Sequence, residues 1–240
     1  MTDWEQYALL QYLAKQASRN GANSHLPSLK EVGDELGWSI TRVREELAVA
    51  KALGFVEARP RVGLRRLPYT FTPAASLSLH YALALDSKTY FQQFADLRQK
   101  IEAAYFQEAA RLLTDEDKAH LKELIRSAWQ QLRDEPIHIP HAEHRDLHLT
   151  IYSRLNNAFV QGLLEAYWDA YESVGYSRYT DYAYLSKVWE YHQQIVDAIC
   201  AGDYEAGYRA LLEHTKLLYH HPIEGNPSEP PATPEKLKER

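Results

Sequence analysis

The segment LPSLKEVGDELGWSITRVREELAVAKALGFVEARPRVG, residues 26–63, decides the fold of the N-terminal part of the chain. Ser28 and Glu31 have the spacing of a capping box, which predicts the start of a short helix. Gly37 ends this helix, and Ser39 has the position of the N-cap of a second one. Two short helices joined at a glycine form a helix-turn-helix pattern.

The residues on either side complete a small DNA-binding fold. Residues 4–19 have apolar side chains at helical spacing, which predicts a helix that Asn20-Gly21 ends. Residues 55–66 alternate in strand fashion around a turn at 60–63, which predicts a hairpin, or wing. We therefore expect a winged helix-turn-helix domain of three helices and a β-hairpin wing over residues 1–70.

The second helix of the pair begins with hydroxyl and basic side chains, as required of a helix whose N-terminal end enters the major groove. These side chains can contact phosphates and base edges, a residue of the preceding helix can contact the backbone, and the arginines around the wing glycine can contact a minor groove. The predicted DNA-binding residues are Lys30, Ser39, Thr41, Arg42, Arg44, Arg61 and Gly63, with Arg59, Arg65 and Arg66 also in the wing. The alternative is a small helical domain whose arginines are simply solvated.

The rest of the chain is predicted to be all-α. After a linker at 71–75, residues 76–222 have successive helical patterns that indicate an antiparallel bundle of six to seven helices, at about 76–85, 87–113, 115–134, 141–155, 157–174, 182–201 and 203–221. Residues 223–240 are rich in proline and charge and are predicted to be disordered. The fold class is thus mostly α.

Composition restricts the class of protein further. Residues 1–70 contain 10 Lys and Arg against 8 Asp and Glu, whereas the other residues contain 17 against 25, so a mildly basic end joins an acidic body. The single cysteine, Cys200, excludes an internal disulfide and fits a reducing compartment. No signal pattern or apolar run of membrane-spanning length is present, so we expect a cytoplasmic protein without membrane contact.

Four histidines have informative spacing. His144 and His148 are four residues apart on one predicted helix, so they share a face. His192 and His214 each lie 11 residues from Asp203, where two helices turn, so an antiparallel hairpin brings them to the same height. The two pairs can converge on one metal ion, and an all-nitrogen set favours zinc, nickel or copper over magnesium or calcium. The alternative is that these are ordinary packed or surface histidines; His138, His141, His220 and His221 are interpreted as surface residues.

Residues 8–66 resemble the winged helix-turn-helix of GntR-type regulators. They share the Leu-Pro-Ser opening, the Ser-x-Thr-x-Val-Arg-Glu helix start, the Leu-Gly-Phe-Val entry to the wing and the wing glycine. The family usually has an arginine where this chain has Ile40. Loss of that potential guanine contact implies an altered operator, with a thymine methyl group as a possible substitute contact.

Residues 76–221 are similar to the FCD (FadR C-terminal) ligand-binding domain of the same regulators. The resemblance rests on Leu97-Arg98-x-x-Ile101-Glu102, on HRDLHLTIYSRLNNAF and on EYHQQIVDAICAGDYEAGYRALLEH. It implies that His148, His192 and His214 are metal ligands, with His144 where the family normally has an aspartate, and that Asn157 occupies the family's asparagine position. Zinc or nickel is the expected metal. Alternatively, His144 marks a site that no longer binds metal.

The resemblance also implies a small carboxylate effector that completes the metal coordination. Arg98 is the candidate for pairing with its carboxylate, although it can equally pair with Glu102 or Asp96 and anchor the bundle. Tyr152, Tyr167, Tyr171, Tyr176 and Tyr208 are candidates for pocket walls, core or dimer surface alike.

Together these features predict a homodimeric regulator, with repression the expected output, that binds double-stranded operator DNA and responds to an effector by a population shift. The rivals are a helical metalloenzyme that uses the histidine site and a DNA-binding protein whose C-terminal domain only dimerises.

Overall fold

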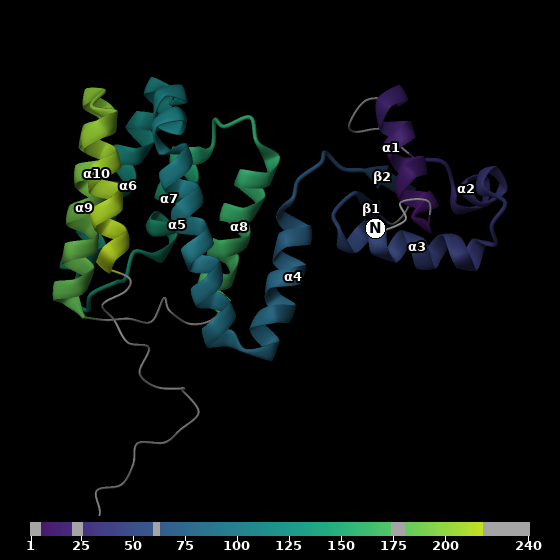
Figure 1. Ribbon diagram of the computed structural model, residues 1–240, viewed down its shortest axis with the longest axis horizontal. Coiled ribbons are helices and arrows are strands. Elements are labelled where there is room, and N and C mark those ends of the chain that lie inside the picture. The colour runs from purple at the N-terminus through teal and green to yellow at the C-terminus, as the bar shows by residue number, and fades with distance from the viewer. Residues whose placement is uncertain (1–5, 21–25, 60–62, 174–180, 218–240) are drawn as a thin grey trace, which may run out of the picture.

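The computed structural model describes residues 6–20, 26–59, 63–173 and 181–217. Its N-terminal part has three helices and a two-stranded antiparallel sheet (Figure 1). The elements are α1 (Ala8–Asn20), α2 (Leu29–Leu36), α3 (Ile40–Ala52), β1 (Val56–Arg59) and β2 (Gly63–Arg66). This is the predicted arrangement of a winged helix-turn-helix.

Local capping explains where the helix pair begins and turns. The Ser28 hydroxyl accepts a hydrogen bond from the Glu31 N–H, while the Glu31 carboxylate accepts one from the Ser28 N–H, so the predicted capping box is present. Gly37 ends α2 with φ of +68°, a left-handed conformation that glycine adopts at little cost. The Ser39 side chain then accepts a hydrogen bond from the Arg42 N–H and caps α3.

The hairpin is attached to the helices through backbone and core contacts. In the antiparallel register of β1 and β2, Val56 lies opposite Arg66 and Arg59 lies opposite Gly63. The Leu26 N–H donates to the Leu64 carbonyl at 3.0 Å, which ties the chain before α2 to the second strand. A single apolar cluster that includes Leu9, Val43, Leu47 and Val56 holds the three helices and the hairpin together.

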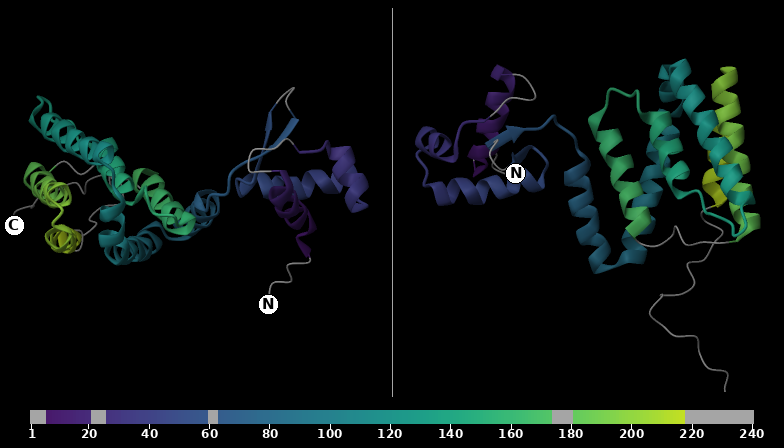
Figure 2. Two further views of the ribbon diagram at one scale, coloured as in Figure 1. Left: turned by 90° about the horizontal axis from the view of Figure 1, so that it is seen from above. Right: turned by 180° about the vertical axis from the view of Figure 1, so that it is seen from behind.

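The C-terminal part consists of seven described helices that pack as a bundle, consistent with the six to seven predicted. They are α4 (Thr72–Leu85), α5 (Ser87–Leu112), α6 (Asp115–Arg133), α7 (His141–Tyr152), α8 (Ala158–Ser173), α9 (Tyr182–Ala201) and α10 (Tyr204–Leu217). The pair α9–α10 lies at the side of the bundle far from the N-terminal part, and α4 lies at the near side (Figures 1 and 2). The fold class is therefore confirmed as mostly α.

The predicted linker differs from the structure at its C-terminal side. α4 begins at Thr72, within the segment 71–75 that was expected to be irregular. Pro73 lies in the first turn, where its missing N–H leaves no helical bond unmade, so proline starts this helix instead of preventing it. The same proline packs against Gly54 at the end of the DNA-binding unit. The approach is so close that a Cβ placed on Gly54 would lie 2.5 Å from Pro73 Cγ. The expected last helix is described to Leu217, and the proposed tail at 223–240 lies outside the described residues.

Two close approaches fix the packing inside the bundle. A Cβ on Gly162 of α8 would lie 2.6 Å from the Thr72 backbone nitrogen, so only glycine allows α8 to lie this close to the start of α4. Gly207 of α10 faces the Phe106 ring in the same manner, with 3.0 Å between a built Cβ and Phe106 Cζ. The hairpin between α9 and α10 turns at Gly202, whose φ is +76°.

Candidate metal centre and DNA-binding surface

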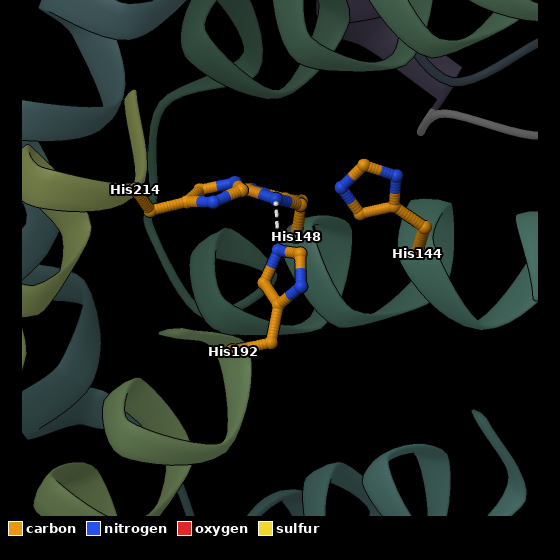
Figure 3. Close-up of side chains that lie close together, drawn as sticks. All are labelled: His144, His148, His192 and His214. Carbon is orange, nitrogen blue, oxygen red and sulfur yellow. Dashed lines mark hydrogen bonds between the residues drawn. The ribbon is translucent and has the colours of Figure 1, made fainter. Parts of the chain in front are cut away.

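Four histidine side chains from three helices meet in the interior of the bundle. α7 contributes His144 and His148, α9 contributes His192, and α10 contributes His214 (Figure 3). One ring nitrogen of each lies within 4.8 Å of one ring nitrogen of every other. The convergence predicted from the spacing is therefore present, and their role as metal ligands stays a prediction.

Two of the ring nitrogens have the spacing of ligands to one ion. His148 Nε2 and His192 Nε2 are 3.1 Å apart. Two nitrogens bound to one zinc ion at the usual bond length lie about 2.8–3.4 Å apart, depending on whether the geometry is octahedral or tetrahedral. In the metal-free chain this contact is a hydrogen bond, and with His148 Nδ1 protonated His192 Nε2–H is its donor. After loss of that proton the two nitrogens have the separation of neighbouring corners of a coordination sphere.

Glu102 of α5 determines which nitrogen of His148 faces the cluster. Its carboxylate Oε1 lies 3.0 Å from His148 Nδ1, and both side chains are buried. A carboxylate accepts hydrogen bonds, so Nδ1 carries the proton and the Nε2 lone pair is directed toward the other histidines. A carboxylate on the outer ring nitrogen commonly orients metal-binding histidines in this way.

Arg98 is the buried counterion of Glu102. Its Nη1 lies 3.5 Å from Glu102 Oε2, and the two side chains are 2% and 0% exposed. Its guanidinium also lies over the rings of Tyr167 and Trp168, at 4.5 and 5.5 Å from their centroids. The ion pair that was weighed as the structural role of Arg98 is therefore present. Burial opposes ionisation of Glu102, but the charge of Arg98, followed by the interaction and hydrogen bond with His148, outweighs it and lowers the pKa of this carboxyl.

Three of the histidine rings, those of His144, His192 and His214, are held neutral. Burial, followed by the neighbouring histidines and Arg98, lowers the pKa values of His144 and His192 well below their usual range. The same causes lower the pKa of His214 to about 3. Neutral imidazole is the form that donates a lone pair to a metal ion.

Several buried polar atoms around the cluster have no hydrogen-bond partner among the described residues. These are Nε and Nη2 of Arg98, Nε2 of His144, Nδ1 of His192, Nδ1 of His214 and Nε1 of Trp168. An unsatisfied buried donor or acceptor costs about 1–3 kcal/mol, so such a concentration indicates a site for a bound group. The histidine nitrogens of this site fit a metal ion, and the N–H groups of Arg98 and Trp168 fit an anion beside it.

Aromatic rings enclose the position of His144. Its ring centroid lies 4.7 Å from that of Trp168, 6.1 Å from that of Tyr171 and 6.1 Å from that of Trp189. These walls replace water around the cluster by apolar surface, which strengthens electrostatic interactions inside it. Asp146, two residues from His144, is exposed on the other side of α7 and is not part of the cluster.

Asn157, an expected effector-binding residue, has a local role in the structure. Its side-chain oxygen accepts hydrogen bonds from the Phe159 and Val160 N–H groups and so caps α8, while its amide nitrogen lies 3.4 Å from the Tyr105 hydroxyl. These bonds account for an asparagine at this position without an effector. An effector contact by Asn157 stays a prediction.

Most of the predicted DNA-binding residues are accessible to solvent. Lys30, Thr41, Arg42 and Arg44 are exposed, as is Gly63, whose φ of +90° shapes the wing. Arg42 stacks on the Trp38 ring at 4.0 Å, which orients its guanidinium at the start of α3. The Ser39 hydroxyl already accepts the capping bond, but its proton remains available to a phosphate. Ile40 is 43% exposed, so an apolar side chain does face outward where the family usually has arginine.

The wing differs from the expectation at one arginine. Arg66 is only 5% exposed, because its strand position faces the core of the unit, so its expected place on the DNA-binding surface is wrong. Arg59 and Arg65 are accessible, and both lie near the Glu57 carboxylate, at 3.1 and 3.9 Å. Arg61 lies outside the described residues.

The expectation for the other histidines and tyrosines is met in part. His138 is exposed and pairs with Asp134, whereas His141 is half-buried; His220, His221 and Tyr176 lie outside the described residues. Tyr152 is core, since its buried hydroxyl donates to the Glu102 carbonyl at 2.9 Å. Over the described residues, every helix is too short or too polar to cross a membrane.

Comparison with known proteins agrees with this architecture. The FCD domain family matches residues 93–217. The HTH-type transcriptional regulator YieP of Escherichia coli K12 is 29% identical over 192 residues, covering 77% of this chain and 80% of that protein. An E. coli K12 protein named as an L-lactate dehydrogenase operon regulatory protein is 26% identical over 204 residues, covering 82% of this chain and 78% of that protein. The solved structure of a Streptococcus agalactiae GntR protein has a TM-score of 0.66 at 17% identity, covering 90% of this chain and 97% of that one.

A helix-turn-helix with a wing, joined to a helical bundle that matches the FCD family, defines a DNA-binding transcription regulator rather than an enzyme. The chain belongs to the FCD-domain family of GntR regulators, of the FadR type.

Sequence reasoning missed the roles of Glu102 and Trp168. Glu102 was noted only as a partner for Arg98, because nothing in its spacing relates it to His148, which is 46 residues away. Trp168 has helical spacing typical of core, and its contact with the cluster depends on how α8 packs. The local signal in the sequence was an acidic residue one turn after an arginine, in a helix of otherwise mixed character.

Proposed function

We propose that this chain is a ligand-responsive DNA-binding regulator whose C-terminal domain binds a divalent metal ion and a small organic acid. The convergence of four histidine nitrogens beside a buried arginine with unpartnered N–H groups carries this proposal. Residues 1–70 form the DNA-binding domain, and the helices from α4 onward, beginning at Thr72, form the effector-binding and dimerisation domain to about residue 222. The protein acts in the cytoplasm, and repression is its output.

The metal ion is zinc or nickel, held by His144, His148, His192 and His214. All four donors are imidazole nitrogens, which suit borderline metals and disfavour calcium and magnesium. No carboxylate is among the four, so the bound ion keeps its full double positive charge, and the adjacent Glu102 is already compensated by Arg98. The site therefore attracts an anion.

A carboxylate is the effector class that these charges and donors favour. Arg98 uses Nη1 for Glu102 and has Nε and Nη2 without a partner among the described residues. One face of the guanidinium can thus donate two hydrogen bonds to a carboxylate without breaking the internal ion pair. Asn157 provides a further contact to the effector.

The protein works as a homodimer on double-stranded operator DNA. One winged helix-turn-helix makes few base contacts, and two of them on a palindrome add their binding free energies. The effector changes operator affinity by binding one arrangement of the two DNA-binding domains better than the other.

Elemental analysis of the purified protein without a histidine tag tests the metal site. We expect about one zinc or nickel ion per chain in the wild type and in a His120→Ala/His138→Ala control, which removes two exposed histidines. The His148→Ala/His192→Ala variant should have none. Absence of metal from the wild type, even after incubation with excess ion and desalting, would overturn the coordination part of the proposal.

A further inference from the structure

The indole N–H of Trp168, on α8, is a buried donor next to the histidine cluster. Trp168 is 1% exposed, and its Nε1 has no hydrogen-bond partner within the part of the chain that the structure describes. Its ring centroid lies 4.7 Å from that of His144 and 5.0 Å from that of His148. A buried tryptophan normally has a partner for its N–H. The indole therefore places an unused donor beside two of the proposed metal ligands.

Arg98 supplies two more unused donors close to the same indole. Its Cζ lies over the Trp168 ring, 5.5 Å from the centroid, and its Nη1 is paired with Glu102. Its Nε and Nη2 have no partner among the described residues. These two N–H groups lie along one edge of the planar guanidinium, and such an edge receives both oxygens of a carboxylate.

The donors of Arg98 and Trp168 are offset from each other. The guanidinium lies over the face of the indole, whereas the indole N–H lies in the plane of that ring. A carboxylate held in the plane of the guanidinium is therefore directed away from the indole N–H. A second acceptor, one or two carbons away from this carboxylate, is needed to reach Trp168.

The aromatic walls restrict the length of an acid that binds here. The Trp168 ring centroid lies 5.3 Å from those of Tyr167 and Tyr171, and the His144 ring lies 6.1 Å from that of Trp189. Rings at these separations are in contact. A short acid requires only small shifts of the rings, whereas a long acyl chain or an aromatic acid would force them apart.

We propose that Trp168 determines the specificity of the effector site, because its N–H selects short acids with a second acceptor on carbon 2 or carbon 3. That acceptor is a hydroxyl, a keto oxygen or a second carboxylate. This inference rests on the proposed function and narrows its class of effector. A plain methylene group at the same position leaves the indole N–H unsatisfied, so the unsubstituted acid binds less tightly.

The binding of matched acids tests this role of Trp168. Butyrate is compared with 2-hydroxybutyrate, and propionate with malonate, so that the number of carbons is equal within each pair. Isothermal titration of the purified protein in the presence of zinc gives the affinity ratio of each pair. We expect a ratio of at least about tenfold in the wild type and a decrease of about tenfold in Trp168→Phe. A contact of the second acceptor with the metal raises the ratio in both proteins, so the difference between them reports on the indole N–H.

Two further proteins separate the N–H from the shape of the ring. Trp129→Phe, at a half-buried position of α6 outside the cluster, should keep the wild-type ratios. Substitution of Trp168 by benzothienylalanine keeps the size of the indole and replaces its N–H by sulfur, so it should lower the ratios as Trp168→Phe does, even if the phenylalanine variant folds poorly.

The outcomes distinguish this inference from the proposed function. Acids that bind with the same ratios in the wild type and in the benzothienylalanine protein would overturn the role of Trp168 and leave the effector site in place; a buried water would then be the partner of the indole. Failure of all four acids to bind the wild type would overturn the effector site together with this inference. Zinc content per chain, measured on the same samples, reports separately on the metal.

Discussion

The carboxylate of Glu102 and the imidazole of His148 form a buried hydrogen bond of 3.0 Å between α5 and α7. This bond fixes the tautomer of His148 and turns its second nitrogen toward His192. Because the ligand orientation depends on a residue that is not itself in the cluster, changes at Glu102 test the site without removing any of its nitrogens.

Glu102→Gln should weaken metal binding while leaving all four histidines in place. The amide oxygen still accepts the His148 bond, but the negative charge that makes the imidazole more basic is lost, and Arg98 loses its counterion. Loss of a group that hydrogen-bonds a metal ligand typically lowers metal affinity by about 10–100-fold. Competition with a chromogenic zinc chelator measures this, with Glu108→Gln, at an exposed position on the same helix, as the control. Equal affinities in both variants would contradict the assigned role of Glu102.

His144→Asp should retain metal and change its selectivity. A carboxylate at this position brings a hard, negatively charged oxygen into the set, which favours manganese relative to nickel. We expect the ratio of nickel to manganese affinity to fall by at least about tenfold, which corresponds to 1.4 kcal/mol. Isothermal titration of the metal-free protein with each ion provides the ratio. An unchanged ratio would show that His144 does not contact the ion.

The metal-free protein should lose stability as the pH falls below about 6.5. His144, His192 and His214 have lowered pKa values in the folded chain, for His214 about 3, so the unfolded chain binds more protons below the ordinary histidine pKa. Their contribution to the free energy of unfolding is complete above that pH and decreases as the pH falls toward the folded-state values, at up to about 1.4 kcal/mol per pH unit for each histidine. Urea unfolding between pH 7 and pH 4 measures the slope. His214→Gln should reduce it, and an unaltered slope in that variant would contradict the buried neutral state.

Gly162→Ala should destabilise the contact between α8 and the start of α4. The added Cβ would lie 2.6 Å from the Thr72 backbone nitrogen and 2.8 Å from the carbonyl carbon and the Cβ of Phe71. These atoms belong to the backbone or are bonded to it, so they cannot move without moving the chain. Overpacking of this kind costs about 1–3 kcal/mol. Thermal unfolding should show a lower midpoint for Gly162→Ala than for Glu172→Ala, an exposed change on the same helix. Equal midpoints would mean that the two helices separate easily at this point.

Arg42→Gln should weaken binding to duplex DNA and reduce its dependence on salt. Arg42 is exposed at the start of α3 and is oriented by the Trp38 ring. If it neutralises one phosphate, the slope of log affinity against log salt should fall by about 1. Fluorescence anisotropy with a labelled duplex at several salt concentrations measures the slope, and Arg126→Gln, on the surface of the bundle, is the control. A slope that is the same in both variants would exclude Arg42 from the interface.

The DNA-binding unit was largely predictable because its signals are local. Ser28 with Glu31, Gly37 and Ser39 act within three or four residues of the backbone groups that they satisfy, so their effect does not depend on distant parts of the chain. Arg66 was misplaced because alternation in a four-residue strand does not say which side faces the core. The start of α4 was placed too late because Pro73 resembles a linker residue until its helix is seen.

The sequence by itself determined the helices, the wing and the four histidines at spacings that can meet, since capping and periodicity depend on near neighbours. The tertiary structure decided which residues meet across the bundle. The bond of Glu102 to His148 and the approach of Gly162 to Thr72 join positions far apart in the chain, and each depends on the rotation of two packed helices. Helices with apolar residues on more than one side can pack in several ways, and burial of the whole core selects one of them.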